Sequence, residues 1–498
     1  MLHRLFYYVR NLWHGQETVG KRLVSSSAII FLEKLVIKGI QFVRTVVVAR
    51  ILFPDDLGLF AMASLALGIT NVFFTTGFAS ALIYEKDAEK YLDSAWTVNV
   101  IRGILLSILL FFVVAPLAGI FFKNPAAVPF ARALAVVCFI GGFENVALVF
   151  FQKELQFIRL FLFDVASVVV QVIVTIVSVV LLRSAWALVF GVIAAHLTNL
   201  IVSYMVHPFR PRFTLDMAGA RRLFKFGKWI SVTAILGFFI NQGDSAIVGR
   251  VLDASSLGFY QIAFALGMLP AAEFTRSFSS VLFPLYAKVR HDAEKLKDSF
   301  IRVSRVLFLI SVPASFGILA LAPDIVRMVY GEKWLPLVPA LYVLVFLGLI
   351  RTVDYAVSPL LLGIGKPRVQ TETLIAQTVV MYVGIVPLTK MFGTVGTALS
   401  VVIGAAVLVC IYIFRIRGTI SIGFKTLVAI AALPFAASVI MASIIFAVHP
   451  LMTITHWTTL LSYVAGGALL YFGVLFLLDA LLAKRTYYRS LVWIKENI

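Results

Sequence analysis

Two stretches of this chain share one pattern: VVVARILFPDDLGLF at residues 46–60 and SAIVGRVLDASSLGFY at residues 245–260. Aligned two hundred residues apart, they match Arg50 with Arg250. Both then continue with Leu-Gly and end on an aromatic residue. A repeat of this period indicates that two halves of the chain share one architecture.

Composition places this architecture in a membrane. The chain has 498 residues, of which 61% are hydrophobic and 13% charged, and its mean hydropathy is +1.00. Helices that are apolar on all sides need lipid around them. Two cysteines, Cys138 and Cys410, lie far apart in apolar segments, so we expect neither a disulfide framework nor a thiolate metal site.

Apolar runs of about 20 residues predict about fourteen transmembrane helices. They lie near residues 25–49, 57–84, 96–121, 129–151, 160–182, 185–206, 224–251, 257–284, 303–322, 337–363, 370–391, 393–414, 424–447 and 458–481. The first and seventh carry the repeated pattern, so six helices form one unit and both units have the same orientation. The predicted fold is therefore an all-α integral membrane protein with two parallel six-helix repeats and two additional C-terminal helices.

The net charge is +19, and the basic residues that produce it are concentrated in particular loops and at the chain ends. Lys and Arg gather in the N-terminal arm, after the sixth and eighth segments and in the C-terminal tail, whereas alternate loops contain few. By the positive-inside rule both termini are cytoplasmic, and the charge favours anionic lipid over nucleic acid as a partner. The predicted parts are a cytoplasmic amphipathic arm (1–24), an N-terminal bundle (25–206), a basic linker (207–223), a second bundle (224–417), two further transmembrane helices (418–482) and a basic cytoplasmic tail (483–498).

The first transmembrane segment contains EKLVIKGIQFVRTVVVAR, residues 33–50, which is apolar apart from several charges. A charge at the bilayer centre costs about 2.5–3.5 kcal/mol on insertion scales. At 100° per residue the polar side chains share one arc of roughly 140°. We predict that this arc faces a bundle interior or a wet cavity and that its excess positive charge binds an anion; its members are Glu33, Lys34, Lys38, Gln41 and Arg44.

The seventh segment repeats this polar theme with the opposite charge. It carries Asn241, Gln242 and Asp244, and Asp244 takes the place of Arg44. Its carboxylate is a candidate for coupling to protons or sodium, because its environment can change between two access states. The alternative is that Asp244 pairs with Arg44 or Lys38 and holds the two bundles together.

Two further pairs lie one helical turn apart: Glu273 with Arg276, and Arg351 with Asp354. Either pair can be an internal ion pair that specifies packing. Alternatively, Arg276 contributes to the substrate cavity, and Glu273, Asp354 and Glu33 are further candidates for ion coupling.

The outer turns allow two interpretations of their charges. Arg50 and Arg250 either snorkel to the outer interface or act as gates. FPDDLG resembles the acidic first outer loop of membrane glycosyltransferases, but the outer loops of this chain are too short to hold an acceptor. We therefore interpret Asp55 and Asp56 as part of a turn that connects two helices.

Seven stretches, two of which include the repeated pattern, carry a family resemblance: ARILFPDDLGLFAMA, TTGFASALIYEKD, WALVFG, DSAIVGRVLDASSLGFYQIAFALGMLP, VLFPLYAKVRHD, LAPDIVRMVYGEKW and LLLGIGKP. Across roughly residues 25–420 the chain resembles Wzx-type polysaccharide flippases of the multidrug/oligosaccharidyl-lipid/polysaccharide (MOP) exporter superfamily, and it is most similar to the colanic-acid-exporter branch. The resemblance implies a V-shaped pair of bundles in a bacterial inner membrane. It also implies transfer of undecaprenyl-pyrophosphate-linked oligosaccharide to the periplasmic leaflet, with a polysaccharide polymerase and a chain-length regulator as partners.

FVRTVVVAR, residues 42–50, is similar to the first-helix arginine motif of lipid II flippases, which places Arg44 and Arg50 on its basic positions. The second helix has no arginine, where those relatives carry one in the cavity, so the resemblance does not extend to lipid II specificity. The residues themselves support transport of an anion, because Lys34, Lys38 and Arg44 offer a pyrophosphate a cationic path. Polar amides, including Gln41, Asn241 and Gln242, can contact sugars.

Two other functions stay open at this point. An ion-coupled drug exporter of the same superfamily needs an acidic or aromatic cavity, whereas the first helix is basic. A membrane glycosyltransferase or polymerase needs a large outer domain. The chain has no phosphate-binding loop and no histidine spacing typical of a metal site, so we expect a secondary transporter rather than an enzyme, with no cofactor and no metal.

Overall fold

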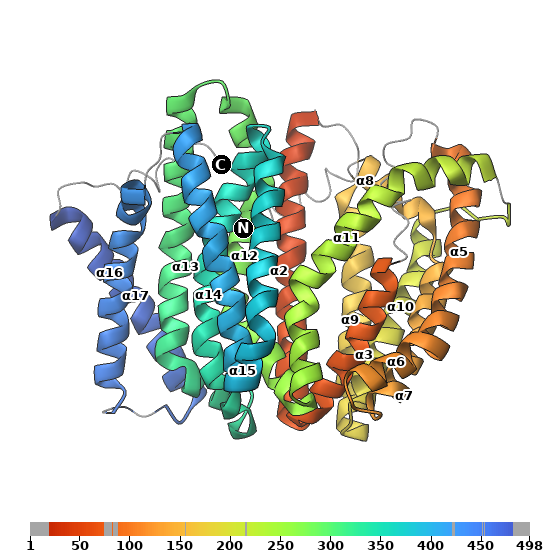
Figure 1. The fold of residues 1–498 in the computed structure, drawn as a ribbon, viewed down its shortest axis with the longest axis horizontal. Helices are drawn as coiled ribbons and strands as arrows, with labels where there is room; N and C mark the ends of the chain where they lie inside the picture. The colour runs from red at the N-terminus through yellow and green to blue at the C-terminus, as the bar shows by residue number, and fades with distance from the viewer. Residues whose placement is uncertain are drawn as a thin grey trace, which may run out of the picture. The chain divides into compact units, whose positions relative to one another are not determined.

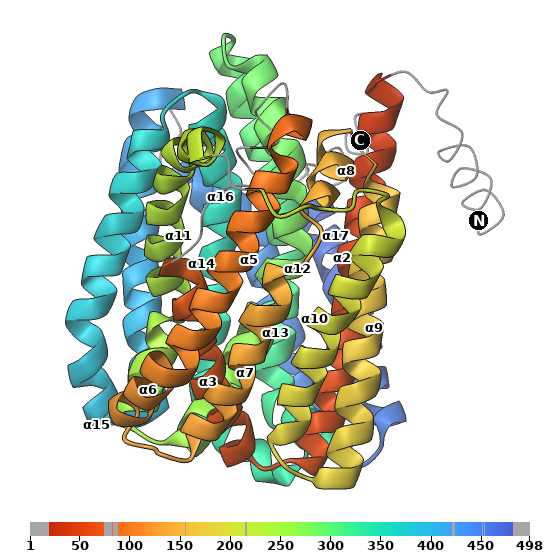
Figure 2. The same ribbon diagram turned by 90° about the vertical axis from the view of Figure 1, so that its right-hand side faces the viewer.

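The computed structural model describes residues 19–73, 82, 88–154, 156–214, 217–420, 424–450, 452 and 454–481. These ranges are almost entirely helical and contain no strand (Figures 1 and 2). Among the described helices, nine are long and apolar enough to cross a membrane, and a bent pair can form a tenth span. The predicted all-α membrane fold is confirmed. The basic tail and most of the N-terminal arm lie outside the described residues.

The chain divides into two compact units between Gly243 and Asp244, inside one helix. In unit 1, α2 packs against α9, which lies beside α10, and α7 contacts α3, α5 and α10 (Figure 2). The helices of this unit are α2 (Val19–Ile51), α3 (Pro54–Phe73), α5 (Leu92–Leu109), α6 (Ala115–Phe121), α7 (Ala127–Gly142), α8 (Val149–Lys153), α9 (Phe157–Leu182), α10 (Trp186–Val206) and the first part of α11 (Met217–Val251).

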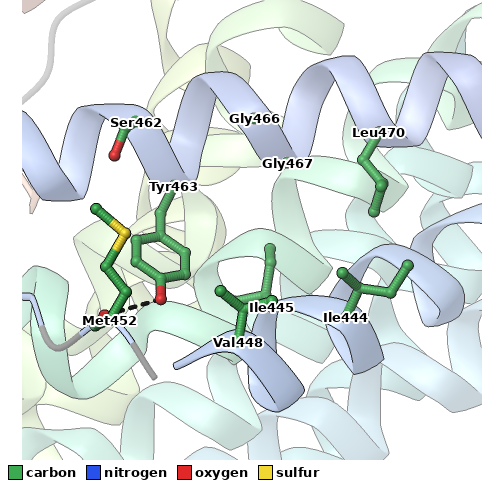
Figure 3. A pocket seen from close by; sticks show the side chains of 9 residues that line it. All are labelled: Ile444, Ile445, Val448, Met452, Ser462, Tyr463, Gly466, Gly467 and Leu470. Atoms are coloured by element: carbon green, nitrogen blue, oxygen red, sulfur yellow. Dashed lines mark hydrogen bonds between the residues drawn. The ribbon is translucent and has the colours of Figure 1, made fainter. Parts of the chain in front are cut away.

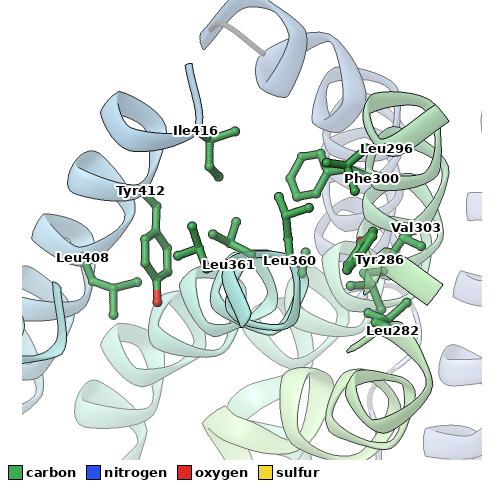
Figure 4. Close-up of a cluster of buried hydrophobic side chains, with 13 residues drawn as sticks. Leu282, Tyr286, Leu296, Phe300, Val303, Leu360, Leu361, Leu408, Tyr412 and Ile416 are labelled. Carbon is green, nitrogen blue, oxygen red and sulfur yellow. The ribbon is translucent and has the colours of Figure 1, made fainter. Parts of the chain in front are cut away.

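Unit 2 begins within α11 and continues with α12 (Ala254–Val289), α13 (Ala293–Val329), α14 (Val338–Gly363), α15 (Pro367–Ile420), α16 (Phe424–Val448) and α17 (Trp457–Leu481). Its buried core includes Tyr286, Phe300, Leu360 and Tyr412 (Figure 4). The C-terminal helices α16 and α17 pack on α13, where the Tyr471 hydroxyl donates to the Leu309 carbonyl at 3.0 Å.

The repeated stretch forms the same turn in both units. Helix α2 ends at Ile51 and α3 begins at Pro54, while α11 ends at Val251 and α12 begins at Ala254. Equivalent backbone hydrogen bonds close the two turns: Leu52 N to Val48 O (2.8 Å) and Leu252 N to Val248 O (3.0 Å), then Leu57 N to Phe53 O (3.4 Å) and Leu257 N to Asp253 O (3.1 Å). The repeat predicted from the sequence is therefore confirmed in its local structure.

Acidic residues cap the helix after each turn. In unit 1, Asp56 lies in the first turn of α3 and accepts a hydrogen bond from Phe53 N at 3.2 Å. In unit 2, Asp253 precedes α12 and accepts from Ser256 N at 2.6 Å. These are the two halves of a capping box, which satisfies the N–H groups left open where a helix begins. The acidic FPDDLG loop thus contributes a helix cap, as the interpretation of a connecting turn predicts.

Three features of the helices differ from the prediction. The segment predicted at 129–151 breaks after α7 with a bend of 69°, where the Asn145 side chain accepts from Ala147 N at 3.0 Å. The segment predicted at 96–121 contains a π-helical turn at Leu110–Val114, directly before Pro116, whose nitrogen cannot donate.

The third difference concerns the predicted linker 207–223. Helix α11 already begins at Met217, because the basic residues after it are mixed with Ala and Leu, which favour helix. The predicted break between segments 370–391 and 393–414 is confirmed, since Gly393 interrupts α15 with φ 59° and ψ −138°.

Helices α5 and α7 approach closely at a pair of glycines. A Cβ atom built on Gly103 would lie 2.6 Å from Gly142 Cα and 2.8 Å from the Cys138 carbonyl oxygen. Small residues of this kind let two membrane helices meet at the backbone. We expect Gly103→Ala to destabilise the protein by about 1–3 kcal/mol, because the backbones must separate. Thermal unfolding in detergent measures this change.

Gly141→Ala is the matched control, because a Cβ at Gly141 meets nothing within 4 Å. It should leave the melting temperature unchanged or raise it slightly. Equal melting temperatures for the two variants would show that this contact does not constrain α5 against α7.

Candidate functional site

The predicted cationic arc lies on one continuous helix, α2, so the spacing assumed from the sequence applies. Lys34 and Lys38 are exposed, whereas Gln41 and Arg44 are half-buried. The Thr45 hydroxyl donates to the Gln41 carbonyl at 2.9 Å. The side chain of Glu33 lies outside the described residues.

Arg44 is the most enclosed cation of this arc. Within unit 1, neither a hydrogen bond nor an ion pair joins its guanidinium to a described residue. An arginine offers five donors in a planar fork, and leaving such a group without an acceptor in a membrane is costly. The arrangement suits an anion that arrives from outside the protein.

The polar stretch of α11 places its residues differently. Asn241 and Gln242 are exposed, and the Asn241 side chain donates to the Gly237 carbonyl of its own helix at 2.7 Å. Asp244, in contrast, is buried, with 3% of its surface exposed.

The buried carboxylate of Asp244 has a defined set of partners. One oxygen accepts from the Tyr260 hydroxyl at 2.8 Å, and the other accepts from Ser245 N at 2.7 Å. Gln261 donates to the Ser245 hydroxyl at 3.2 Å, and Tyr382 of α15 interacts electrostatically with Asp244. Among the described residues of unit 2, no Lys, Arg or His forms an ion pair with this carboxylate. Within unit 2, hydrogen bonds from Tyr260 and Ser245 are therefore what stabilises this carboxylate.

Tyr260 is a site residue that the sequence analysis missed. It is fully buried in α12 and stands where the first repeat has Phe60. The signal was present in the alignment of the two repeats. The hydroxyl appears only in the repeat that replaces Arg44 with Asp244, so the two positions change together.

The predicted pair Arg351 and Asp354 forms an ion pair of 3.3 Å in α14. The Tyr412 hydroxyl also donates to Asp354 at 3.1 Å, and Tyr412 belongs to the buried cluster in Figure 4. Asp354 is thus neutralised within its own unit, which favours the packing interpretation over ion coupling. Glu273 and Arg276 lie in α12, but their side chains fall outside the described residues, so their roles stay predictions.

Arg50 and Arg250 occupy equivalent positions in the last turns of α2 and α11. Arg50 is exposed and Arg250 is half-buried. A cation at this place interacts favourably with the negative end of the helix dipole. This geometry is compatible with both predicted roles, and a role in gating stays a prediction.

A groove of about 240 Å³ lies between α16 and α17 (Figure 3). Its lining is apolar, and its one buried hydroxyl is occupied: Tyr463 donates to the Met452 carbonyl at 2.8 Å. The groove therefore offers no charged group to a phosphate. No group of His, Cys, Asp and Glu suited to a metal ion occurs in the described part of the chain.

The fold of this chain is similar to the folds of known membrane transport proteins. The chain is similar in structure to the lipid II flippase MurJ in an inward closed conformation, with a TM-score of 0.72 at 15% identity over 93% of this chain and 100% of that one. It is also similar to an inward-facing multidrug resistance MATE family transporter of the MOP superfamily, with a TM-score of 0.60 at 17% identity over 78% and 98%. It thus has the fold of MOP superfamily membrane proteins and is a multi-pass membrane protein.

A sequence relative is the lipopolysaccharide biosynthesis protein WzxC of Escherichia coli K12, which is 24% identical over 77% of this chain and 78% of its own length. Residues 47–339 match the family described as polysaccharide biosynthesis protein. The chain belongs to this family. The resemblance inferred from its sequence motifs is confirmed.

Proposed function

We propose that this protein is a flippase that moves undecaprenyl-pyrophosphate-linked oligosaccharide from the cytoplasmic to the periplasmic leaflet, for export of a surface polysaccharide. The observation that carries the proposal is Arg44, a half-buried cation on α2 with no hydrogen-bond or ion-pair partner among the described residues of unit 1. Relatives named for polysaccharide biosynthesis, such as WzxC, support the same class of cargo.

The proposed role of the cationic arc is to hold the pyrophosphate. This group carries negative charge, so its passage through a bilayer needs both cations and water. Lys34 and Lys38 are exposed on α2 and attract the anion as point charges, whereas the fork of Arg44 makes paired hydrogen bonds to phosphate oxygens. Polar amides contact the sugars, and the lipid tail stays in the membrane.

The proposed transport cycle uses alternating access of two repeats. Unit 2 contributes the coupling group, Asp244, whose hydrogen bond from Tyr260 holds the carboxylate in one orientation. Binding and release of a proton or a sodium ion at this carboxylate would change its charge in each cycle. Only a ligand that binds the two access states differently can drive such a change.

The proposed setting is the inner membrane of a bacterium, with both termini in the cytoplasm. The basic loops support this orientation and favour contact with anionic lipids. A polymerase and a chain-length regulator on the periplasmic side would consume the delivered units.

A thermal-shift experiment on the purified protein separates this function from drug export. An undecaprenyl-pyrophosphate oligosaccharide at about 100 times its dissociation constant should stabilise the fold by about 2.7 kcal/mol. A lipophilic organic cation should leave the melting temperature unchanged. Stabilisation by the cation alone would replace the proposal with drug export.

The cavity itself makes a further prediction. In a variant that lacks Cys138 and Cys410, Lys38→Cys and Arg44→Cys should react with small water-soluble thiol reagents in the folded protein, because the arc faces water. Val48→Cys is the matched control on the same helix, since Val48 is 2% exposed. Labelling of all three only after unfolding would contradict a hydrated arc.

A further inference from the structure

A second unpaired cation lies in unit 1, on a helix other than α2. Arg102 is near the middle of the span Glu89–Phe121, about 15 Å along α5 from its first residue at 1.5 Å per residue. The residue is half-buried. Charged side chains at this depth are costly, face the protein interior or water, and usually mark a functional site.

The neighbours of Arg102 are polar but neutral. One amino group of its guanidinium donates to the Asn99 side-chain oxygen at 3.3 Å, while its Nε is buried without an acceptor. The Cys138 thiol of α7 lies 4.0 Å from the Asn71 side-chain oxygen. No carboxylate of unit 1 forms an ion pair with Arg102 within the described ranges.

The surrounding contacts keep Arg102 available. The Asn99 amide donates to the carbonyls of Gly141 and Gly142 at 3.1 Å each, so its oxygen is the atom that remains for Arg102. Glu144, in the break that follows α7, instead lies 3.5 Å from His196. The close contact of the adjacent Gly103 with α7 fixes this part of α5.

We propose that Arg102, supported by Asn99, binds a second anionic oxygen group of the transported molecule. A planar guanidinium with a single neutral partner suits a phosphate or a carboxylate, which can accept two parallel hydrogen bonds. The site is carried by α5, whereas the cationic arc is carried by α2. It rests on the proposed function, since it assumes that the cargo is a lipid-linked glycan.

The anion has two possible sources: the phosphates of the lipid carrier, or an acidic sugar in the glycan. Native mass spectrometry of the purified protein can separate them with three ligands: undecaprenyl pyrophosphate, the same lipid bearing a neutral oligosaccharide, and the same lipid bearing an oligosaccharide with a uronic acid. We expect Arg102→Gln to weaken binding roughly 10- to 100-fold, as loss of a charged hydrogen bond does. Weakening for all three ligands assigns the phosphates; weakening for the uronic acid ligand alone assigns the sugar.

Arg132→Gln is the matched control, because Arg132 lies in α7 and stacks over the Phe111 ring at 5.3 Å. It should bind all three ligands as the wild type does. The melting temperature without ligand adds a second test. A binding role predicts that Arg102→Gln keeps or raises it, because an uncompensated charge is removed.

Wild-type affinity of Arg102→Gln for every ligand would overturn the proposal, as would a lower melting temperature with unchanged affinity. Failure of the wild type to bind any of the three ligands would instead contradict the proposed function. The two failures are therefore distinguishable.

Discussion

Arg44→Ala is expected to lower the rate of lipid-linked oligosaccharide translocation by about 100-fold or more, with normal protein levels and an unchanged melting temperature. Within unit 1 the guanidinium has no hydrogen-bond or ion-pair partner among the described residues, so its removal leaves no group of that unit unsatisfied. What is lost is a pair of charge-assisted hydrogen bonds to the pyrophosphate, each worth about 1.5–3 kcal/mol. The initial rate in proteoliposomes measures the effect.

Arg44→Lys should recover part of the rate, because the charge remains while the planar fork is lost. Arg132→Ala, an arginine of the same unit that stacks on Phe111, should transport at the wild-type rate. If Arg44→Ala retained full activity, the pyrophosphate would have to be held by other residues.

Asp244→Asn is expected to make transport independent of an imposed ion gradient. The amide keeps the size of the side chain but can neither bind a proton at neutral pH nor balance a sodium ion. Transport should be measured with and without a pH gradient, and separately with and without a sodium gradient. The gradient that accelerates the wild type and not Asp244→Asn identifies the coupling ion.

Tyr260→Phe removes the hydroxyl that donates to Asp244 but keeps the carboxylate. Transport by this variant should still respond to the ion gradient, but the half-maximal response should occur at a different concentration of the coupling ion. Asp324→Asn serves as the control: Asp324 is also buried in unit 2, but it is paired with His449 at 2.9 Å. A full gradient response in Asp244→Asn, or its loss in Asp354→Asn instead, would move the coupling site away from Asp244.

The repeated pattern predicted the fold because it encodes a local structure. The turn between two helices depends on residues near in sequence, so Leu52 and Leu252 close equivalent turns. Gly393 likewise marks the break in α15, since its positive φ is a conformation that glycine adopts readily. Hydropathy predicted a membrane fold of long helices, because lipid requires long apolar helices. Nine of the described helices, or ten with the bent pair, are long and apolar enough to span a membrane, so the count of fourteen stays a prediction.

The features that the sequence did not predict depend either on contacts between helices or on local breaks within a helix. The bend after α7 is capped by Asn145, which an apolar average over 20 residues does not register. The hydrogen bond from Tyr260 to Asp244 depends on how α12 lies against the end of α11. Hydropathy contains no information on which side chains of two helices face each other. The polar arc of α2 follows from helix geometry alone and could therefore be predicted from the sequence. Which residues surround Arg44 depends on how the helices of unit 1 pack, so only the structure could show that it has no partner there.

The central claim is tested most directly by translocation in proteoliposomes that contain only the purified protein. A fluorescent undecaprenyl-pyrophosphate oligosaccharide is placed in both leaflets, and a glycan-cleaving enzyme outside reports how much becomes accessible. The account predicts that wild-type protein exposes nearly all of the lipid-linked oligosaccharide, whereas liposomes with Arg44→Ala expose only the half that began in the outer leaflet. Cleavage that stops at one half with correctly folded wild-type protein would contradict the proposed function.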